Sequence, residues 1–314
     1  MADIRPAQGR LGRHGAAALL AVMASIAAAA MAVALLEIQD SSIRRMEGMV
    51  ARAAAAESAR AAVERAARSL IHTPVSELGA AGEDGSLPSM LDLTAGTGVR
   101  VAVFCEQGKI NLNNLVSKGL PSAPDIKTFI NLLNLTGLPP EMADALADWM
   151  DPDNQRRIPG GAEDEYYIGL IPPRLPGNRP LAAVEEAAMA KGFDPEAMAR
   201  LIPHVTALPE RVRMNVNTAT ATALAAAVEG LGTADAARIV KNRKSAPFST
   251  IAAFKEALPA QVGAGIQETA FTTQGDFFTV RAEASSGQAW ARETQLVRIN
   301  REKNGFTVIW RRTF

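Results

Sequence analysis

The chain opens with a long apolar segment that carries no charge, residues 16–36, AAALLAVMASIAAAAMAVALL. As an α-helix this segment would span about 31 Å, close to the hydrocarbon thickness of a bilayer. Three arginines, Arg5, Arg10 and Arg13, precede it and favour a cytoplasmic N-terminus. We therefore predict a transmembrane helix over residues 16–36.

A polar helical pattern continues directly from this segment. Residues 37–71 contain no proline, and apolar residues such as Ile43, Met46 and Val50 recur near helical spacing. Pro74 ends the pattern. The prediction is one helix from about residue 16 to about residue 72, roughly 85 Å long.

The rest of the chain alternates between turns, helices and strands. Residues 73–98 are rich in Gly, Pro, Ser and Asp and predict a loop, while the β-branched Val99–Cys105 predicts a strand in which Cys105 is buried. Helical patterns fall into two blocks, 122–205 and 215–258. The helices predicted in these blocks are Asp125–Leu135, Glu141–Met150, Leu181–Lys191, Pro195–Ile202, an alanine-rich helix with its N-cap in Asn215–Thr218, Ala234–Asn242 and Phe248–Leu258.

From residue 276 on, polar and apolar residues alternate, which predicts an antiparallel meander of strands. The predicted strands are Phe277–Ala284, Gln288–Asn300 and Phe306–Arg312. The organisation is then a leader (1–15), a transmembrane helix (16–36), the first part of a helix-and-sheet domain (37–121), an inserted α-helical domain (122–270) and the C-terminal strands of the first domain (271–314). This is an α+β fold with a large all-α insertion.

The balance of charges and the motifs that are missing from the sequence limit the possible functions. Lys plus Arg and Asp plus Glu number 33 each, so no global field draws the chain to nucleic acid or anionic lipid. The single cysteine, Cys105, excludes an internal disulfide and the CxxC zinc patterns. Outside the leader the histidines are His72 and His204, and no nucleophile, zinc-protease or nucleotide motif is present. We predict a protein that is not an enzyme, with His204 as a surface or packing residue.

A helix-hairpin-helix pattern lies in the second helical block. Gly230-Leu-Gly232 followed by Ala236 fits the glycine turn of such SAM-like units, and Gly137-Leu-Pro-Pro140 is a weaker copy. Residues 215–254 resemble the competence-type DNA receptor domain, in which such a turn holds a phosphate. Residues 122–260 have few aromatics and no strong basic surplus, which favours a purely structural hairpin over DNA binding.

Carboxylates gather at the end of the predicted helix Glu141–Met150 and on the loop that follows it. They are Asp148, Asp151, Asp153, Glu163, Asp164 and Glu165. Hard oxygen ligands on a loop of rigid proline and flexible glycine suit Ca²⁺. The loop is not an EF-hand, because Arg156 stands where that loop needs glycine and Ala162 where it needs glutamate. Spacing alone leaves a calcium site and a solvated acidic loop equally open.

The N-terminus resembles the leader of type IV pilins and pseudopilins: a basic stretch, a glycine, an apolar run and a long amphipathic continuation. In those proteins prepilin peptidase cuts after the glycine, here Gly15, so that Ala16 becomes the first mature residue. The fifth mature position is usually glutamate, and here it is Leu20. A plain signal anchor is the alternative.

Several motifs, in order along nearly the whole chain, resemble general secretion pathway protein K, the large minor pseudopilin family of type II secretion. They are Asn111-Leu-Asn113, Asp148-Trp149-Met-Asp151-Pro-Asp153, Gly161-Ala-Glu163-Asp164, Tyr166-Tyr167, Asn178 and Asn215-Val-Asn217-Thr218. The resemblance implies a pilin-like fold with an inserted helical domain. It also implies a calcium-binding acidic loop, with Asp151, Asp153, Glu163 and Asp164 as the expected ligands and Asp148 and Glu165 next.

The same resemblance implies a place and partners for the chain. It would be a single-pass protein of the bacterial inner membrane with its C-terminal bulk in the periplasm, at the tip of the pseudopilus. There it would initiate or cap assembly for protein export, with I- and J-type minor pseudopilins, the major pseudopilin and prepilin peptidase as partners. The runner-up is a membrane-anchored DNA receptor of the competence type, which does not explain the acidic loop or the C-terminal strands.

Leu20 supports the tip position on physical grounds. In the family, glutamate at the fifth mature position is thought to pair with the N-terminal amine of a neighbouring subunit. A buried carboxylate without such a partner is costly. A subunit that starts the assembly has no subunit above it, and Leu20 removes the need for one.

Overall fold

The computed structural model describes residues 11–73, 81, 87 and 98–314, and only the backbone of residues 11–16. Most of the predicted leader and nearly all of the predicted loop 73–98 therefore lie outside the described residues. The chain forms two compact units, residues 1–55 with 285–290, and residues 56–284 with 291–314.

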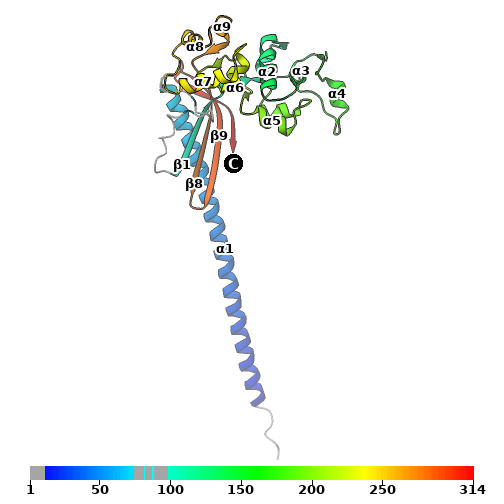
Figure 1. Cartoon of the computed structure of the whole chain (residues 1–314). Helices are drawn as coiled ribbons and strands as arrows, with labels where there is room; N and C mark the ends of the chain where they lie inside the picture. The colour runs from blue at the N-terminus through cyan, green and yellow to red at the C-terminus, as the bar shows by residue number, and fades with distance from the viewer. Residues whose placement is uncertain (1–10, 74–80, 82–86, 88–97) are drawn as a thin grey trace, which may run out of the picture. The chain divides into compact units, whose positions relative to one another are not determined.

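Helix α1 (Leu11–His72) is continuous through the predicted membrane segment and its polar continuation (Figure 1). It begins five residues before the predicted start at residue 16, since each glycine inside a long helix costs only about 1 kcal/mol and both Gly12 and Gly15 are tolerated there. Within the described residues, α1 is the helix that is long and apolar enough to cross a membrane, and its apolar window is fully exposed.

Four strands form an antiparallel sheet in the order β1-β8-β9-β10 (Figure 1). The strands are β1 (Val99–Cys105), β8 (Phe277–Ser286), β9 (Ala289–Asn300) and β10 (Gly305–Thr313). In β1, Val103 pairs with Val280 of β8. The sheet therefore joins two parts of the chain that lie on either side of the helical insertion, as the sequence predicts.

Alternate residues of β1 and β8 face the last turns of α1 and form a buried core. Val63 and Leu70 of α1 are fully buried against Val103 and Val280. Cys105 lies at the end of the same row, and burial raises the pKa of its thiol. The prediction of a buried cysteine is confirmed.

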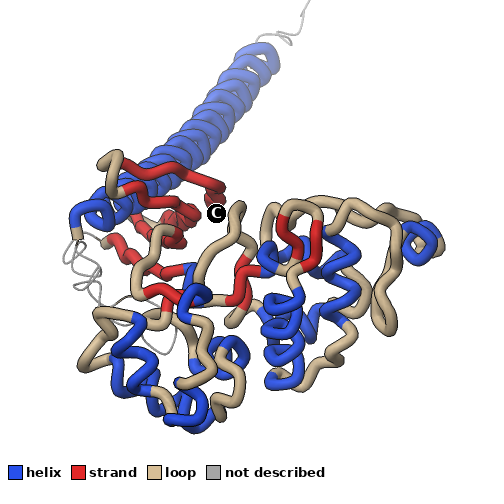
Figure 2. The backbone as a smooth tube through the Cα atoms, turned by 90° about the horizontal axis from the view of Figure 1, so that it is seen from above, coloured by secondary structure: helices blue, strands red, loops and turns tan. Residues whose placement is uncertain are grey.

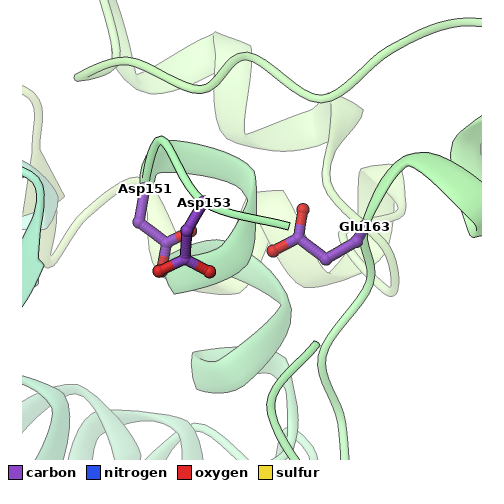
Figure 3. A group of neighbouring side chains, drawn as sticks. All are labelled: Asp151, Asp153 and Glu163. Atoms are coloured by element: carbon purple, nitrogen blue, oxygen red, sulfur yellow. The ribbon is translucent and has the colours of Figure 1, made fainter. Parts of the chain in front are cut away.

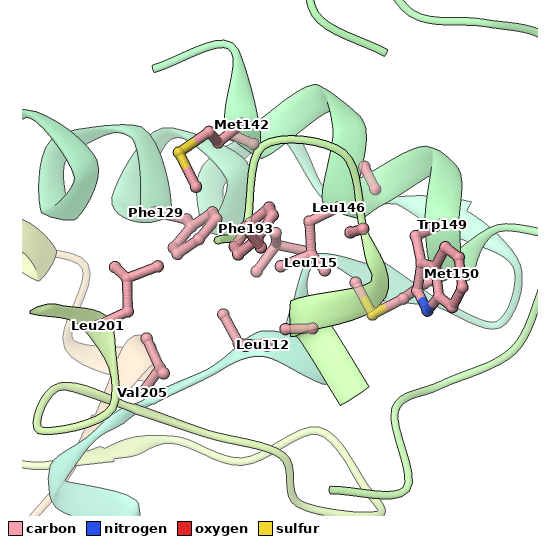
Figure 4. Packing of buried hydrophobic residues seen from close by; sticks show 14 of the residues in the cluster. Leu112, Leu115, Phe129, Met142, Leu146, Trp149, Met150, Phe193, Leu201 and Val205 are labelled. Atoms are coloured by element: carbon pink, nitrogen blue, oxygen red, sulfur yellow. The ribbon is translucent and has the colours of Figure 1, made fainter. Parts of the chain in front are cut away.

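The first helical block has a core of its own. Its elements are α2 (Ala123–Leu135), α3 (Met142–Met150), α4 (Asp164–Ile168), the 3-10 helix η4 (Val184–Met189) and α5 (Pro195–Leu201). Leu115, Phe129, Leu146 and Phe193 are buried together in it, and the rings of Phe129 and Phe193 stack at 6.4 Å (Figure 4). This core carries the acidic loop.

The second helical block contains the glycine hairpin. Its elements are α6 (Ala221–Ala227), α7 (Thr233–Arg243), α8 (Ile251–Ala257), α9 (Ala260–Gly263) and the 3-10 helix η5 (Glu268–Ala270). Gly230, at φ 79°, allows the turn between α6 and α7, and both helices pack around Phe254. Figure 2 shows the helices gathered in two groups, with loops and short strands between them.

Buried asparagines tie these segments together. Asn113 bonds the backbone of Leu181 in both directions, at 2.8 and 3.0 Å, and donates to the carbonyl of Leu208 at 2.9 Å. Asn217 bonds Phe248 in the same two-way manner, at 2.8 and 2.9 Å. Each side-chain amide thus makes the two hydrogen bonds that a neighbouring strand would make, and it joins segments that lie far apart in the sequence. This explains why these motifs are rich in asparagine.

Short pairings that the sequence pattern does not predict complete the fold. They are the 3-10 helices η2 (Glu106–Gly108) and η3 (Leu112–Asn114), the parallel pairs of β2 (Ile110–Asn111) with β5 (Val205–Thr206) and of β6 (Met214–Asn215) with β7 (Phe271–Thr272), and the antiparallel pair of β3 (Val116–Ser117) with β4 (Leu120–Pro121). Elements of two or three residues are too short to show periodicity in the sequence.

Two local predictions were wrong. The α-helix predicted over Leu181–Lys191 is the shorter 3-10 helix η4, in which backbone hydrogen bonds join residues three apart, as from the amide of Glu186 to the carbonyl of Ala183 at 3.1 Å. The N-cap of α6 is Thr220, whose hydroxyl accepts from the amide of Ala223 at 3.1 Å, since Asn215 and Asn217 are engaged elsewhere.

The core beside α1 gives a stability prediction. We expect Leu70→Ala to lower the free energy of unfolding by about 2–5 kcal/mol, because it opens a cavity between α1 and the sheet. The matched change Leu120→Ala, at a side chain that is 71% exposed, should cost less than about 0.5 kcal/mol. Urea unfolding followed by circular dichroism compares the two; equal losses would contradict the packing described here.

Candidate metal centre

The acidic loop lies between the end of α3 and the start of α4. Asp148 is in the last turn of α3, Asp151 caps its C-terminus, and Asp153 follows in the turn. Glu163 is the residue that precedes α4. Figure 3 shows the carboxylates of Asp151 and Asp153 side by side, with that of Glu163 facing them from the other segment.

Three of these carboxylates come close enough to share one ion. One oxygen each of Asp151, Asp153 and Glu163 lies within 4.8 Å of the others. Asp151 is 1% exposed and Glu163 5% exposed, whereas Asp153 is open to solvent. One buried oxygen of Asp151 and both oxygens of Glu163 have no hydrogen-bond partner. Buried oxygens of this kind are costly unless something donates to them or coordinates them.

Arg157 compensates part of this negative charge. Its Nε lies 3.2 Å from Asp148 Oδ1, and its Nη2 lies 3.7 Å from Asp151 Oδ2. Its backbone amide also donates to Asp148 Oδ2 at 3.0 Å. Asp148 is therefore held by arginine, while Glu163 has no basic partner within 4.0 Å among the described residues.

Aromatic packing fixes the two segments against each other. Trp149, beside Asp148, meets the ring of Tyr167 edge-on at 5.1 Å, and both side chains are buried. The amide of Lys191 donates to the hydroxyl of Tyr167 at 3.2 Å. At Gly161, a Cβ atom would collide with Asp148 Oδ2 and the backbone of Arg157, so that a side chain there would push the loop away from α3.

Burial and mutual repulsion raise the pKa values of these carboxyl groups. Burial, and then the charges of Asp148, Asp151 and Asp153, raise the pKa of Glu163 to about 8. Burial, and then the charges of Asp153 and Asp148, raise the pKa of Asp151 to about 6. Burial also raises the pKa of Asp148, against the opposing effect of Arg157. The negative end of the α3 dipole adds to the cost of a carboxylate at Asp151.

These residues fit a divalent metal ion. The donors are carboxylate oxygens from two segments, the type that Ca²⁺ and Mg²⁺ prefer, and nitrogen or sulfur ligands are absent from the group. A bound cation would coordinate the unpartnered oxygens and offset the repulsion among the three carboxylates.

The structure brings together part of the predicted ligand set. The three carboxylates that come together are those of Asp151, Asp153 and Glu163. Asp148 lies beside them and is paired with Arg157. Asp164 and Glu165 occupy the first turn of α4 and are outside the group.

Sequence reasoning missed the roles of Arg157 and Gly161, although the Gly160-Gly161 pair signals a close backbone approach. His204, predicted as a surface or packing residue, is half-buried and bonds Thr220 at 3.0 Å.

The fold defines the class of protein. A long helix that begins with an apolar segment, an antiparallel sheet packed on its last turns, and a helical insertion between the first and second strands of that sheet are the marks of a pilin-like protein of the α+β class.

The comparisons with known proteins give the family. Family models of type II secretion system protein K match residues 108–210 and 214–274. Type II secretion system protein K of Pseudomonas aeruginosa is 30% identical over 236 residues, covering 74% of this chain and 69% of the relative. That of Klebsiella pneumoniae is 34% identical over 161 residues, covering 47% of this chain and 49% of the relative. The chain belongs to the type II secretion system protein K family.

A solved structure shows the same fold. A chain in the crystal structure of the GspK-GspI-GspJ complex of enterotoxigenic Escherichia coli superposes with a TM-score of 0.63 at 20% identity, covering 88% of this chain and 99% of that chain. The second family match spans the glycine hairpin, so that the stretch which also resembles a competence-type DNA receptor is matched by a secretion family. The predicted family and fold class are confirmed.

The raised pKa values give a pH prediction for the metal-free protein. Between pH 4.5, the ordinary value for Glu, and about 8, folded Glu163 binds more protons than unfolded Glu163. Stability should therefore rise as the pH falls from 8 to 6. We expect Glu163→Gln to remove about 1–2 kcal/mol of this dependence, measured by urea unfolding with a chelator present.

Glu165→Gln is the matched control, since Glu165 is exposed and outside the group. If both variants keep the pH dependence of the parent chain, Glu163 is not the group responsible.

Proposed function

We propose that this chain is the minor pseudopilin at the tip of a type II secretion pseudopilus, where it initiates or caps assembly for protein export across the outer membrane. The observation that carries the proposal is the large helical insertion, matched by the family models, on a pilin-like helix and sheet. A bulky insertion at the head of a stacking subunit obstructs addition above it, which suits a subunit at the end of the assembly.

The apolar start of α1 supports a single-pass anchor in the inner membrane. Arg5, Arg10 and Arg13 favour a cytoplasmic N-terminus, which leaves the sheet and the helical blocks in the periplasm. Prepilin peptidase would cut after Gly15 and make Ala16 the first residue.

The solved relative suggests the partners. The Escherichia coli protein is described in a complex of GspK, GspI and GspJ. By analogy, this chain would assemble with I- and J-type minor pseudopilins and join the major pseudopilin. Nucleic acid has no part in this proposal, and the role is structural, in keeping with a family defined by a component of the secretion machinery.

We also propose that Asp151, Asp153 and Glu163 bind Ca²⁺, with Asp148 as the next candidate, while Asp164 and Glu165, which the family resemblance also implies, lie outside the group. Three carboxylates that share one small volume, two of them buried, support this choice. Calcium accepts irregular oxygen coordination and gives up its water readily, whereas Mg²⁺ demands near-ideal octahedral geometry. In this role the ion holds α4 against the end of α3 and stabilises the first helical block.

Leu20 gives a test of the tip position. The side chain is 67% exposed on α1, where a membrane or neighbouring helices would surround it. We expect Leu20→Glu to reduce co-purification with the I- and J-type subunits and to reduce secretion, because the introduced carboxylate would have no amine above it to pair with.

Leu20→Met, which keeps the position apolar, should behave as the parent chain does. If Leu20→Glu assembles and secretes normally in the same cells, the proposed importance of an apolar residue at this position is wrong.

Calcium binding is tested by thermal unfolding of the full chain in an uncharged detergent. We expect added Ca²⁺ to raise Tm over the chelator-treated protein, since a ligand that binds only the folded state stabilises it by about 2.7 kcal/mol at a hundred times Kd. The rise should be larger at pH 8 than at pH 6, because protons compete for Glu163.

The paired variants Glu163→Gln and Glu165→Gln localise the effect. Glu163→Gln should lose the response to calcium and Glu165→Gln should keep it. Of these two residues, Glu163 belongs to the group of three carboxylates and Glu165 does not. An unchanged Tm in the parent chain with millimolar Ca²⁺ would count against the site, and an equal response to Mg²⁺ would count against the choice of ion.

A further inference from the structure

A large basic cavity lies away from the acidic loop, on the opposite face of the sheet from α1. It has a volume of about 1100 Å³ and is bordered by β1, β8, the turn after α5 and helix α7. Since Val280 of β8 faces α1, the neighbouring Thr279 and Arg281 face the other way, into this cavity. It is larger than the roughly 300–1,000 Å³ of typical small-molecule pockets.

Positive charge dominates the lining. The basic residues are Lys109, Lys241, Arg243, Lys244 and Arg281, and the carboxylate that lines the cavity with them is Glu106. Glu106 is already paired with Lys109 at 3.1 Å. Among the described residues, no carboxylate lies within 4.0 Å of the charged nitrogens of Lys241, Arg243 or Arg281.

Arg243 is the buried member of this group. Its side chain is 1% exposed and donates to the carbonyls of Val216 and Ala219, each at 2.5 Å, while its Nε has no partner. Burial lowers its pKa to about 10. Carbonyl dipoles solvate a guanidinium but do not neutralise it, so a buried cation here still favours an anion nearby.

Apolar side chains share the cavity with these cations. Phe104 lies under the guanidinium of Arg281, 5.6 Å from ring centroid to Cζ, and Ile202, 44% exposed, borders the opening. On α7, the consecutive residues Val240 and Lys241 both line the cavity, so that an apolar and a basic side chain again lie next to each other. The lining is therefore amphipathic as well as positive.

The geometry points to a docking site for an acidic peptide segment of another protein, with carboxylates at the basic residues and apolar side chains against Phe104, Ile202 and Val240. A single-stranded nucleic acid fits less well, because such sites stack successive bases on several aromatic rings. Phe104 is the only Phe, Tyr or Trp that lines this cavity among the described residues, and Arg281 covers its ring, while the ring of His204 is bonded to Thr220. The site depends neither on calcium nor on the tip position.

The test is fluorescence anisotropy with the full chain in an uncharged detergent. The probe is a labelled octapeptide of alternating Glu and Leu, compared with its Gln and Leu analogue. We expect the acidic peptide to bind at low salt, to weaken as salt is added, and to bind about tenfold more tightly than the neutral analogue. If the acidic peptide binds no more tightly than the neutral one, the proposal is overturned.

Paired double variants localise the binding. Lys241→Gln with Arg281→Gln removes two exposed cations of the cavity and should weaken binding of the acidic peptide about tenfold. Arg238→Gln with Arg298→Gln removes two cations outside the lining and should leave binding within about twofold. Equal losses in both double variants would overturn the assignment.

A labelled single-stranded oligothymidine separates the competing ligand. If it binds more tightly than the acidic peptide and is lost in the cavity variant, the site serves phosphates and the peptide proposal is wrong. Circular dichroism checks that each variant is folded. If the double variant does not fold, Lys241→Gln alone replaces it and should also weaken binding of the acidic peptide.

Discussion

Repulsion among the carboxylates that lie close to the end of α3 is the interaction that the first helical block must accommodate. Asp151 and Glu163 are buried, and their neighbours Asp148 and Asp153 add negative charge within the same small volume. Arg157 compensates Asp148 and reaches toward Asp151, but not Glu163. Among the described residues, one oxygen of Asp151 and both oxygens of Glu163 have no hydrogen-bond partner, and a divalent cation of the calcium type would suit these oxygens.

The packing around these carboxylates fixes the two segments that carry them. Trp149 and Tyr167 meet edge-on and tie the end of α3 to α4, and the stack of Phe129 on Phe193 closes the core behind them. Gly161 lets the loop approach α3 closely enough for Asp148 and Arg157 to pair. The core of this block is separate from the core beside α1, but it meets the second helical block at α6, where Ala226 joins the core and its carbonyl accepts from the side chain of Asn131 at 3.1 Å.

The sequence predicts the elements that are long or periodic, and it misses those that depend on a partner far along the chain. The long helix, the strands at Val99–Cys105 and after residue 276, and most helices of both blocks follow from periodicity. Asn113 and Asn217 stand out only as motif residues, because their bonds to Leu181 and Phe248 join distant segments. The acidic string marks the site, but only the folded loop separates Glu163 from its neighbours Asp164 and Glu165.

The chain belongs to the protein K family, and the proposed role of the acidic loop is to bind calcium through Asp151, Asp153 and Glu163. Isothermal titration of the full chain with Ca²⁺, in two buffers of different ionisation enthalpy, measures binding and proton release together. We expect Ca²⁺ binding to release protons at pH 7, since the pKa of Glu163 is raised to about 8, and to release fewer protons at pH 9. An absence of calcium binding, or binding that releases no protons at pH 7, would contradict the proposed role.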